Sequence, residues 1–140
     1  MPLFHLAFPV TDLQATIDFY TQSFGCSLGR QAERWVDLDF YGHQLSCHVA
    51  STHNEAATNP VDGDNIRIPH FGVILDKSAW QALHQRLAQQ GARFALTPKI
   101  RFEGQAGEQG TFFVLDPSNN TLEFKYFNSD RDIFAAGDET

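Results

Sequence analysis

An internal repeat is the feature that most constrains how this chain folds. Residues 4–10 alternate large apolar side chains with His5 and Ala7, the pattern of a strand that buries one face. A helix-like pattern follows and ends at Gly25, and three further strand-like segments complete the unit. The same order of segments recurs in the second half of the chain, with a helix that ends at Gly91. The sequence therefore predicts an α+β fold made of two βαβββ modules.

Composition divides the 140 residues into two modules, a linker and a tail. Module 1 covers about residues 3–50, module 2 covers about residues 67–127, and an acidic tail covers 128–140. The segment 51–66 is polar and contains Asn-Pro and Asp-Gly pairs, which predicts a linker or long loop. A second loop, rich in Gly, is expected over residues 98–110. A chain of this length is expected to form a single domain with one connected core.

Both helices begin with a sequence that is typical of a capping box. In the first, Thr11 is predicted to cap the helix while Gln14 reaches back to the backbone of Thr11. In the second, Ser78 and Gln81 are predicted to have the same two roles. The two boxes place a helix directly after the first strand of each module.

Charge and composition exclude several classes of function. With a net charge of −7 and only 10 Lys plus Arg, binding to nucleic-acid phosphates is not expected. No apolar run approaches the ~20 residues that span a bilayer, and the N-terminus does not resemble a signal peptide. Cys26 and Cys47 lie in predicted strands without metal-type spacing, as expected in a reducing compartment. We therefore expect a cytoplasmic protein that binds neither membranes nor nucleic acid.

Strand parity predicts a candidate metal site on the sheet face opposite the helices. His5 and His70 begin equivalent strands of the two modules, and Glu123 lies in the last strand with matching parity. Phe112 and Val114 are predicted to share this face. Two imidazoles and one carboxylate on adjacent strands form a ligand triad for a divalent metal, with coordination positions left open.

Several motifs along the chain are shared with one known superfamily. They are Phe4-His5-Leu6, Phe24-Gly25, Gly42-His43-Gln44-Leu45, Pro69-His70-Phe71-Gly72-Val73, Asp116-Pro117-Ser118-Asn119-Asn120 and Leu122-Glu123-Phe124. On these motifs the chain resembles the vicinal oxygen chelate superfamily, which includes glyoxalase I, bleomycin and fosfomycin resistance proteins and extradiol dioxygenases. The resemblance covers about residues 3–127, and within the superfamily it is strongest to small extradiol-type dioxygenases.

The resemblance implies two modules that form a cupped mixed sheet around one divalent metal, held by His5, His70 and Glu123. An offset of 77 residues places Ser46 opposite Glu123, where glyoxalase-type members tend to carry a fourth ligand, Glu or Gln. A serine hydroxyl is a poor ligand, so three protein ligands would leave room for a bidentate substrate and dioxygen. This favours Fe(II), and Mn(II), Ni(II) and Zn(II) are the alternative metals.

The function expected from this resemblance is that of an Fe(II)-dependent, extradiol-like dioxygenase acting on a small vicinal diol, enediol or catechol. His48 is the candidate general base, Arg101 is expected to bind an acidic group of the substrate, and Ser46 is expected to contact the substrate. A homodimer is expected.

Three other functions are the alternatives to a dioxygenase. A glyoxalase-type metal-dependent isomerase or lyase would act without consuming oxygen. A bleomycin-resistance-type protein would bind an aromatic ligand in a dimer groove without catalysis. Thiol transfer to fosfomycin would need a more basic cavity than the acidic composition of this chain suggests.

Overall fold

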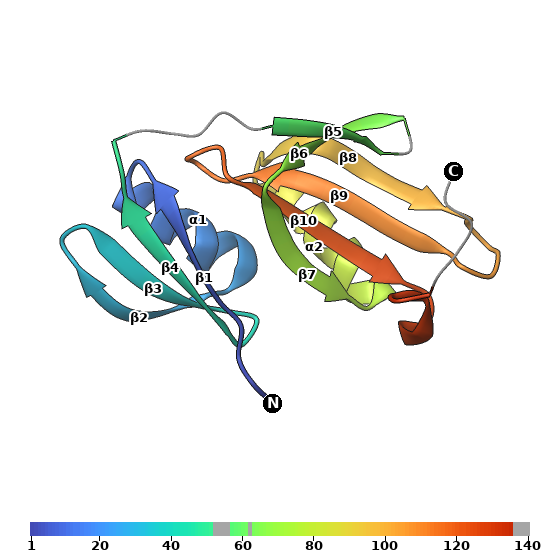
Figure 1. Cartoon of the computed structure of the whole chain (residues 1–140), viewed down its shortest axis with the longest axis horizontal. Helices are drawn as coiled ribbons and strands as arrows, with labels where there is room; N and C mark the ends of the chain where they lie inside the picture. Colours follow the sequence, from blue (N-terminus) through green and yellow to red (C-terminus); the bar gives the residue numbers. More distant parts are fainter. Residues whose placement is uncertain (52–56, 62, 136–140) are drawn as a thin grey trace. The chain divides into compact units, whose positions relative to one another are not determined.

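The computed structural model describes residues 1–51, 57–61 and 63–135, and the chain divides into two compact units. Unit 1 contains Met1–Glu55 and Leu115–Asn120, and unit 2 contains Ala56–Val114 and Thr121–Thr140. Figure 1 shows both units, each with one helix and its own four-stranded sheet. The two predicted βαβββ modules are therefore present, one in each unit.

Unit 1 follows the predicted order of elements. They are β1 (His5–Val10), α1 (Leu13–Phe24), β2 (Ser27–Ala32), β3 (Trp35–Phe40) and β4 (His43–Val49). The sheet order is β1-β4-β3-β2, in which β1 runs parallel to β4 and the other neighbours are antiparallel. Tyr20 on α1 is fully buried with Val10 and Leu38 of the sheet, so the helix covers one face of the sheet as the apolar pattern predicts.

Unit 2 repeats this arrangement. Its elements are β7 (His70–Leu75), α2 (Lys77–Gln89), β8 (Arg93–Arg101), β9 (Gln109–Leu115) and β10 (Thr121–Phe127), followed by the short 3-10 helix η1 (Asp130–Asp132). The sheet order is β7-β10-β9-β8, with β7 parallel to β10. Trp80, Leu83 and Leu87 on α2 are buried, and the Trp80 indole donates a hydrogen bond to the Phe124 carbonyl at 2.9 Å. These contacts cover the helix-facing side of the sheet.

The two parallel strand pairs have the same register. Ala7 of β1 lies opposite Ser46 of β4, and Gly72 of β7 lies opposite Glu123 of β10. Ser46 is therefore the counterpart of Glu123, as the offset of 77 residues predicts.

The predicted capping boxes are wrong by one or two residues. Asp12 caps α1, where its carboxylate accepts from the Ala15 amide at 2.8 Å, and Asp76 caps α2 by accepting from the Ala79 amide at 2.8 Å. A carboxylate beside a helix N-terminus gains more than a hydroxyl because it also meets the positive end of the helix dipole. Thr11 instead contacts Ser118, through a 2.9 Å hydrogen bond from the Thr11 amide and a 3.2 Å hydroxyl pair.

The predicted linker contains regular structure. Strands β5 (Ala57–Val61) and β6 (Asp64–Ile68) pair with each other as a two-stranded antiparallel sheet. Residues 52–56 and 62 of the predicted linker lie outside the described residues. The predicted 98–110 loop is also shorter, because β8 continues to Arg101 and β9 begins at Gln109. The β5–β6 hairpin and the shorter loop, which both differ from the prediction, lie within unit 2.

Buried carboxylates anchor the two turns that border β9. In the loop before β9, Glu108 accepts from the Gly104 amide at 2.8 Å, the Tyr126 hydroxyl at 2.9 Å and the Lys77 ammonium at 2.8 Å. These three contacts lower the pKa of Glu108 to about 2, led by the Gly104 amide. Glu108, which lies within the predicted 98–110 loop, is therefore a buried anchor of that loop.

In the turn after β9, Asp116 accepts from the buried Tyr20 hydroxyl at 2.9 Å and from the amides of Ser118 and Asn120. The Asp-Pro-Ser-Asn-Asn motif is thus built into unit 1 by hydrogen bonds to a buried carboxylate. Among the described residues, the two helices are too short and too polar for either to cross a membrane.

Candidate metal centre and cavity

His70 and Glu123 meet on adjacent parallel strands of unit 2. The His70 Nε2 atom lies 3.2 Å from Oε1 of Glu123. Gly72 allows this approach of β7 to β10, because a Cβ at Gly72 would overlap the backbone carbonyl oxygen of Glu123. The predicted pairing of an imidazole with a carboxylate on this face is therefore present for these two residues.

The far side of each group is held by a second hydrogen bond. His70 Nδ1 lies 2.7 Å from the Arg67 carbonyl oxygen, and a carbonyl oxygen only accepts, so Nδ1 carries the hydrogen. Glu123 Oε2 accepts a 2.6 Å hydrogen bond from the Thr111 hydroxyl. Metal-binding histidines and carboxylates commonly have such outer partners, which fix the tautomer and the direction of the free lone pair. Here they aim Nε2 and Oε1 at the same region.

The electrostatics of the pair agree with this geometry. The hydrogen bond to Glu123 raises the pKa of His70 above its ordinary value, and burial opposes this shift only in part. Burial alone would raise the pKa of Glu123, but the hydrogen bonds from His70 and Thr111 hold it below its ordinary value. Both shifts favour a proton shared between the two groups, and a cation that displaces this proton would find both donors in place.

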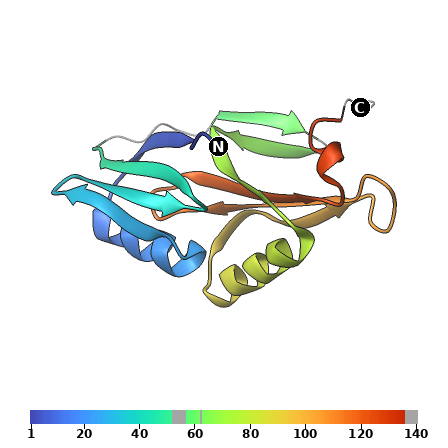
Figure 2. The same cartoon turned by 90° about the horizontal axis from the view of Figure 1, so that it is seen from below.

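A cavity of about 270 Å³ opens beside this pair, entirely within unit 2. It is lined by Val61, Asp64, Ile66, His70, Leu96, Lys99, Arg101, Gln109, Gly110, Thr111, Phe113, Glu123 and Lys125. Figure 2 shows α2 on one side of the β7–β10 sheet and the β5–β6 hairpin on the other. The hairpin that replaces the predicted linker thus supplies part of the cavity wall.

The cavity is more basic than the composition of the chain suggests. Its lining contains the cations Lys99, Arg101 and Lys125 and the carboxylates Asp64 and Glu123, although the whole chain has a net charge of −7. Net charge is a sum over the whole surface, whereas a cavity depends on the few side chains that face it. The expectation of a cavity without basic character is therefore wrong for unit 2.

The parity predicted for β9 is wrong. Phe112 faces α2, where its ring lies 5.7 Å from Trp80, and Val114 is fully buried. Thr111 and Phe113 line the cavity instead, with the Phe113 ring 5.0 Å from His70. Because Phe112, Phe113 and Val114 are all buried, this strand shows no alternation from which its faces could be told apart.

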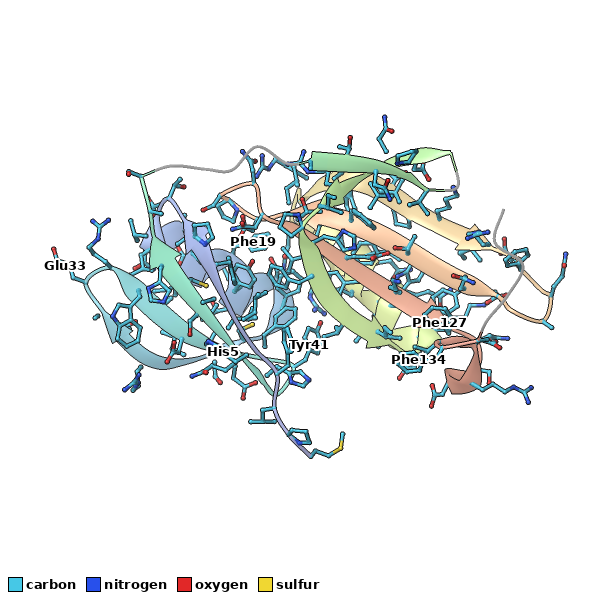
Figure 3. All side chains as sticks on the ribbon, viewed as in Figure 1. His5, Phe19, Glu33, Tyr41, Phe127 and Phe134 are labelled. Atoms are coloured by element: carbon cyan, nitrogen blue, oxygen red, sulfur yellow. The ribbon has the colours of Figure 1, made fainter. Side chains whose placement is uncertain are left out.

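Three of the predicted site residues lie in unit 1. Figure 3 labels His5 at the start of β1, and His48 is an exposed residue of β4 whose ring lies 6.3 Å from Trp35. Ser46 is buried and donates a 2.6 Å hydrogen bond to Asp37. Within residues 1–51, 57–61 and 63–135, no group of three His, Cys, Asp or Glu side chains comes close enough to hold a metal. The structure therefore brings together two of the three predicted ligands, and His5 stays a prediction.

Sequence reasoning missed most of the cavity wall. Val61, Asp64 and Ile66 lie in the predicted linker, and Lys99 and Gln109 lie in the predicted loop. The Asp-Gly pair at residues 62–63, between two segments with β-branched residues, is a hairpin signal that could have identified β5 and β6.

Comparison with known proteins agrees with the fold. The family model of the Glyoxalase/Bleomycin resistance protein/Dioxygenase superfamily matches residues 3–124. Among solved structures, a glyoxalase/bleomycin resistance protein/dioxygenase from Alicyclobacillus acidocaldarius is 39% identical, with a TM-score of 0.79 over 95% of this chain and 96% of that one. No curated protein matches the chain.

More distant structures share the fold alone. The fosfomycin resistance protein FosX from Listeria monocytogenes is 15% identical, with a TM-score of 0.72 over 94% of this chain and 97% of that one. FosX from Mesorhizobium loti is also 15% identical, with a TM-score of 0.68 over 96% and 98% of the two chains. The family model matches residues 3–124, one solved structure is 39% identical, and the chain has the repeated βαβββ modules. The chain therefore belongs to the glyoxalase/bleomycin resistance protein/dioxygenase superfamily.

Proposed function

We propose that this protein is an enzyme that holds one divalent metal, preferably Fe(II), and cleaves a small vicinal diol, enediol or catechol with dioxygen. The proposed ligands are His5, His70 and Glu123. The observation that supports the proposal is the placement of His70 Nε2 and Glu123 Oε1 at 3.2 Å, each with its other polar atom already hydrogen-bonded.

The donor set fits such an ion. One imidazole nitrogen and one carboxylate oxygen suit Fe(II), Mn(II), Ni(II) and Zn(II) alike, and a second histidine would complete a facial triad with open positions. Superfamily members typically bind a divalent metal. Ser46 donates to Asp37, so its hydroxyl is already engaged, which supports a ligand set without Ser46.

The residues of the chain have separate roles in this proposal. Arg67 and Thr111 hold the ring of His70 and the carboxylate of Glu123 in their orientations. Phe113 and Leu96 give the cavity apolar walls that exclude water from the reacting groups. A bound divalent ion would lower the pKa of a substrate hydroxyl and hold substrate and dioxygen side by side. His48 is the proposed base for the released proton.

Metal analysis followed by oxygen uptake tests the proposal. The protein is purified without oxygen, its metals are measured, and uptake is recorded with a panel of catechols. We expect bound iron and oxygen uptake in the wild type, and loss of both in His70→Ala and Glu123→Ala. His43→Asn is the matched control, because His43 lies outside the cavity and contacts the Phe4 amide. We expect it to behave as the wild type.

The other outcomes point to different functions. Bound metal without oxygen uptake across the panel would refute the dioxygenase and favour a glyoxalase-type isomerase or lyase. A wild type that takes up no divalent metal would refute a metal enzyme and favour a ligand-binding protein of the bleomycin-resistance type. His5→Ala tests the third ligand, and full metal content in this variant would remove His5 from the set.

The proposal includes a homodimer in the cytoplasm. Superfamily members commonly act on small molecules and often form dimers. Sedimentation of the full chain measures its oligomeric state, and a monomer at all concentrations would contradict the dimer. The buried, unpaired thiols of Cys26 and Cys47 suit a reducing compartment, and cell fractionation would test that location.

A further inference from the structure

We propose that the β5–β6 hairpin is a flap over the cavity of unit 2, held at its base by Arg67 and closed at its tip by the ion pair of Asp64 and Lys99. Breaking this ion pair lifts the tip and opens the cavity, so access to the cavity depends on the salt concentration. The inference goes beyond the proposed function and needs no metal, because it concerns entry to the cavity whatever binds there.

The strands of the hairpin are at most half-buried. All five residues of β5 are exposed, and the five residues of β6 are exposed or half-buried. The two strands form a sheet of their own, separate from the four-stranded sheet of unit 2. A two-stranded hairpin alone is only marginally stable in water, and segments with few buried apolar contacts open most readily. The hairpin can therefore lift while the four-stranded sheet stays folded.

The base of the hairpin is held by Arg67. Its Nε atom donates a 3.0 Å hydrogen bond to the hydroxyl of Thr121, which is buried. Its carbonyl oxygen accepts the 2.7 Å hydrogen bond from Nδ1 of His70. Arg67 thus joins β6 to both parallel strands, β7 and β10. Since Thr121 is shielded from water, we infer that this end stays in place when the tip lifts.

The tip of the hairpin is held by a more exposed contact. Lys99 Nζ on β8 lies 2.9 Å from the carboxylate of Asp64, at the start of β6. The two side chains are 38% and 33% exposed, so water and salt reach both charges. An ion pair this exposed adds little to stability, and salt weakens it further. The tip contact should therefore break before the contacts of the base.

The hairpin forms the part of the cavity wall that can move. Val61, Asp64 and Ile66 line the cavity from the hairpin, and Leu96 lines it from β8. Lifting the tip would expose Leu96 to solvent. It would leave the metal-binding pair intact, because both members of the pair lie on strands of the four-stranded sheet. The flap would thus control entry without dismantling the candidate metal site.

Labelling of a cysteine introduced into the full chain tests the inference. Leu96→Cys places a thiol in the cavity wall, and Ala95→Cys is the matched control on the exposed, opposite face of β8. Cys26 and Cys47 are buried, and burial raises the pKa of both thiols to about 12, so their background labelling is slow. The reagent is dithiodipyridine, which is neutral, so a charge substitution does not change its local concentration.

Substitutions at the ion pair should change the labelling rate of Leu96→Cys. Added Lys99→Gln should raise the rate about two- to fivefold, the factor expected for the loss of one exposed ion pair. Asp64→Asn should raise it as well, although the two substitutions shift the pKa of a nearby thiol in opposite directions. Lys99→Arg keeps the cation and should keep the rate. Arg86→Gln removes a charge from exposed α2, on the other side of the sheet (Figure 2), and should also leave the rate unchanged.

Salt tests the same contact without altering it. Raising the salt from about 0.05 M to about 0.5 M should speed the labelling of Leu96→Cys, because it screens the exposed pair. The rate should respond much less when Lys99→Gln is added, and Ala95→Cys should label at the same rate at both salt concentrations. In the wild type, amide hydrogen exchange should be faster in β5 and β6 than in β9 and β10, and salt should speed it in the hairpin.

Several results would overturn the inference. They are a rate for Leu96→Cys equal to that of Ala95→Cys, a rate unchanged by Lys99→Gln or by salt, and a rate raised as much by Lys99→Arg as by Lys99→Gln. Hairpin amides that exchange as slowly as those of β9 and β10 would also overturn it. Since the experiment uses no metal, its failure leaves the metal and oxygen measurements unaffected. Likewise, a flap that responds to Lys99→Gln would stand even if no oxygen uptake were found.

Discussion

Replacing Thr111 by valine should weaken metal binding without disturbing the fold. Valine has a methyl group where threonine has its hydroxyl, so the change in volume is small while the hydrogen-bond donor is lost. That hydroxyl donates a 2.6 Å hydrogen bond to Oε2 of Glu123, whose side chain is only 13% exposed. In the variant the carboxylate keeps His70 as a partner on Oε1 but loses the group that fixes its orientation.

The size of the effect follows from the type of contact. A hydrogen bond to a charged group contributes about 1.5–3 kcal/mol, and the lower half of this range applies to a partly exposed carboxylate. Outer partners of metal ligands typically affect metal affinity by about 10–100-fold. We therefore expect Thr111→Val to lower the free energy of unfolding of the metal-free protein by about 1–2 kcal/mol, and to weaken metal binding by about tenfold or more.

Two measurements check this reasoning. Urea denaturation gives the free energy of unfolding, and competition with a chromophoric chelator gives the metal affinity. Thr111→Ser keeps the hydroxyl and should recover most of both quantities, whereas a general packing defect would affect both variants. If Thr111→Val binds metal as tightly as the wild type while Glu123→Ala binds none, then Thr111 does not orient the ligand and this reasoning is refuted.

Three further predictions concern other contacts. Gly72→Ala should lower the free energy of unfolding by about 1–3 kcal/mol and weaken metal binding, because its methyl group would push β7 away from the Glu123 backbone; urea denaturation and chelator competition measure both. Tyr20→Phe should lower the free energy of unfolding by about 1–3 kcal/mol, because it removes a hydrogen-bond donor to the fully buried Asp116. Urea denaturation measures this change, and an unchanged midpoint would contradict it. Glu108→Gln should be less stable than the wild type above the ordinary carboxyl pKa of 4.5. Because folding lowers the pKa of Glu108 to about 2, the difference in stability between the wild type and the variant should disappear as the pH falls from 4.5 towards 2. Acid titrations of both proteins, followed by circular dichroism, measure this difference. A difference in stability that stays constant over this pH range would contradict the prediction.

The repeat and the pairing of His70 with Glu123 could be predicted from the sequence. Alternation of apolar and polar residues in 4–10 reports which face of a strand is buried, and equivalent positions in two copies of a module have equivalent surroundings. The left-handed conformation of Gly25 at the end of α1, with φ of 67°, was likewise predictable from local residue types. All of these are periodic or local properties of the chain.

The tertiary structure decided the rest. The three consecutive buried residues 112–114 conceal the parity of β9, so only packing against Trp80 shows that Thr111 faces Glu123. The basic character of the cavity was also hidden, because Lys99, Arg101 and Lys125 come from two strands and lie within an acidic chain. Local sequence reports the side-chain pattern of one strand at a time. A cavity and its charge depend on which strands the fold brings together, and that is a property of the packed sheet.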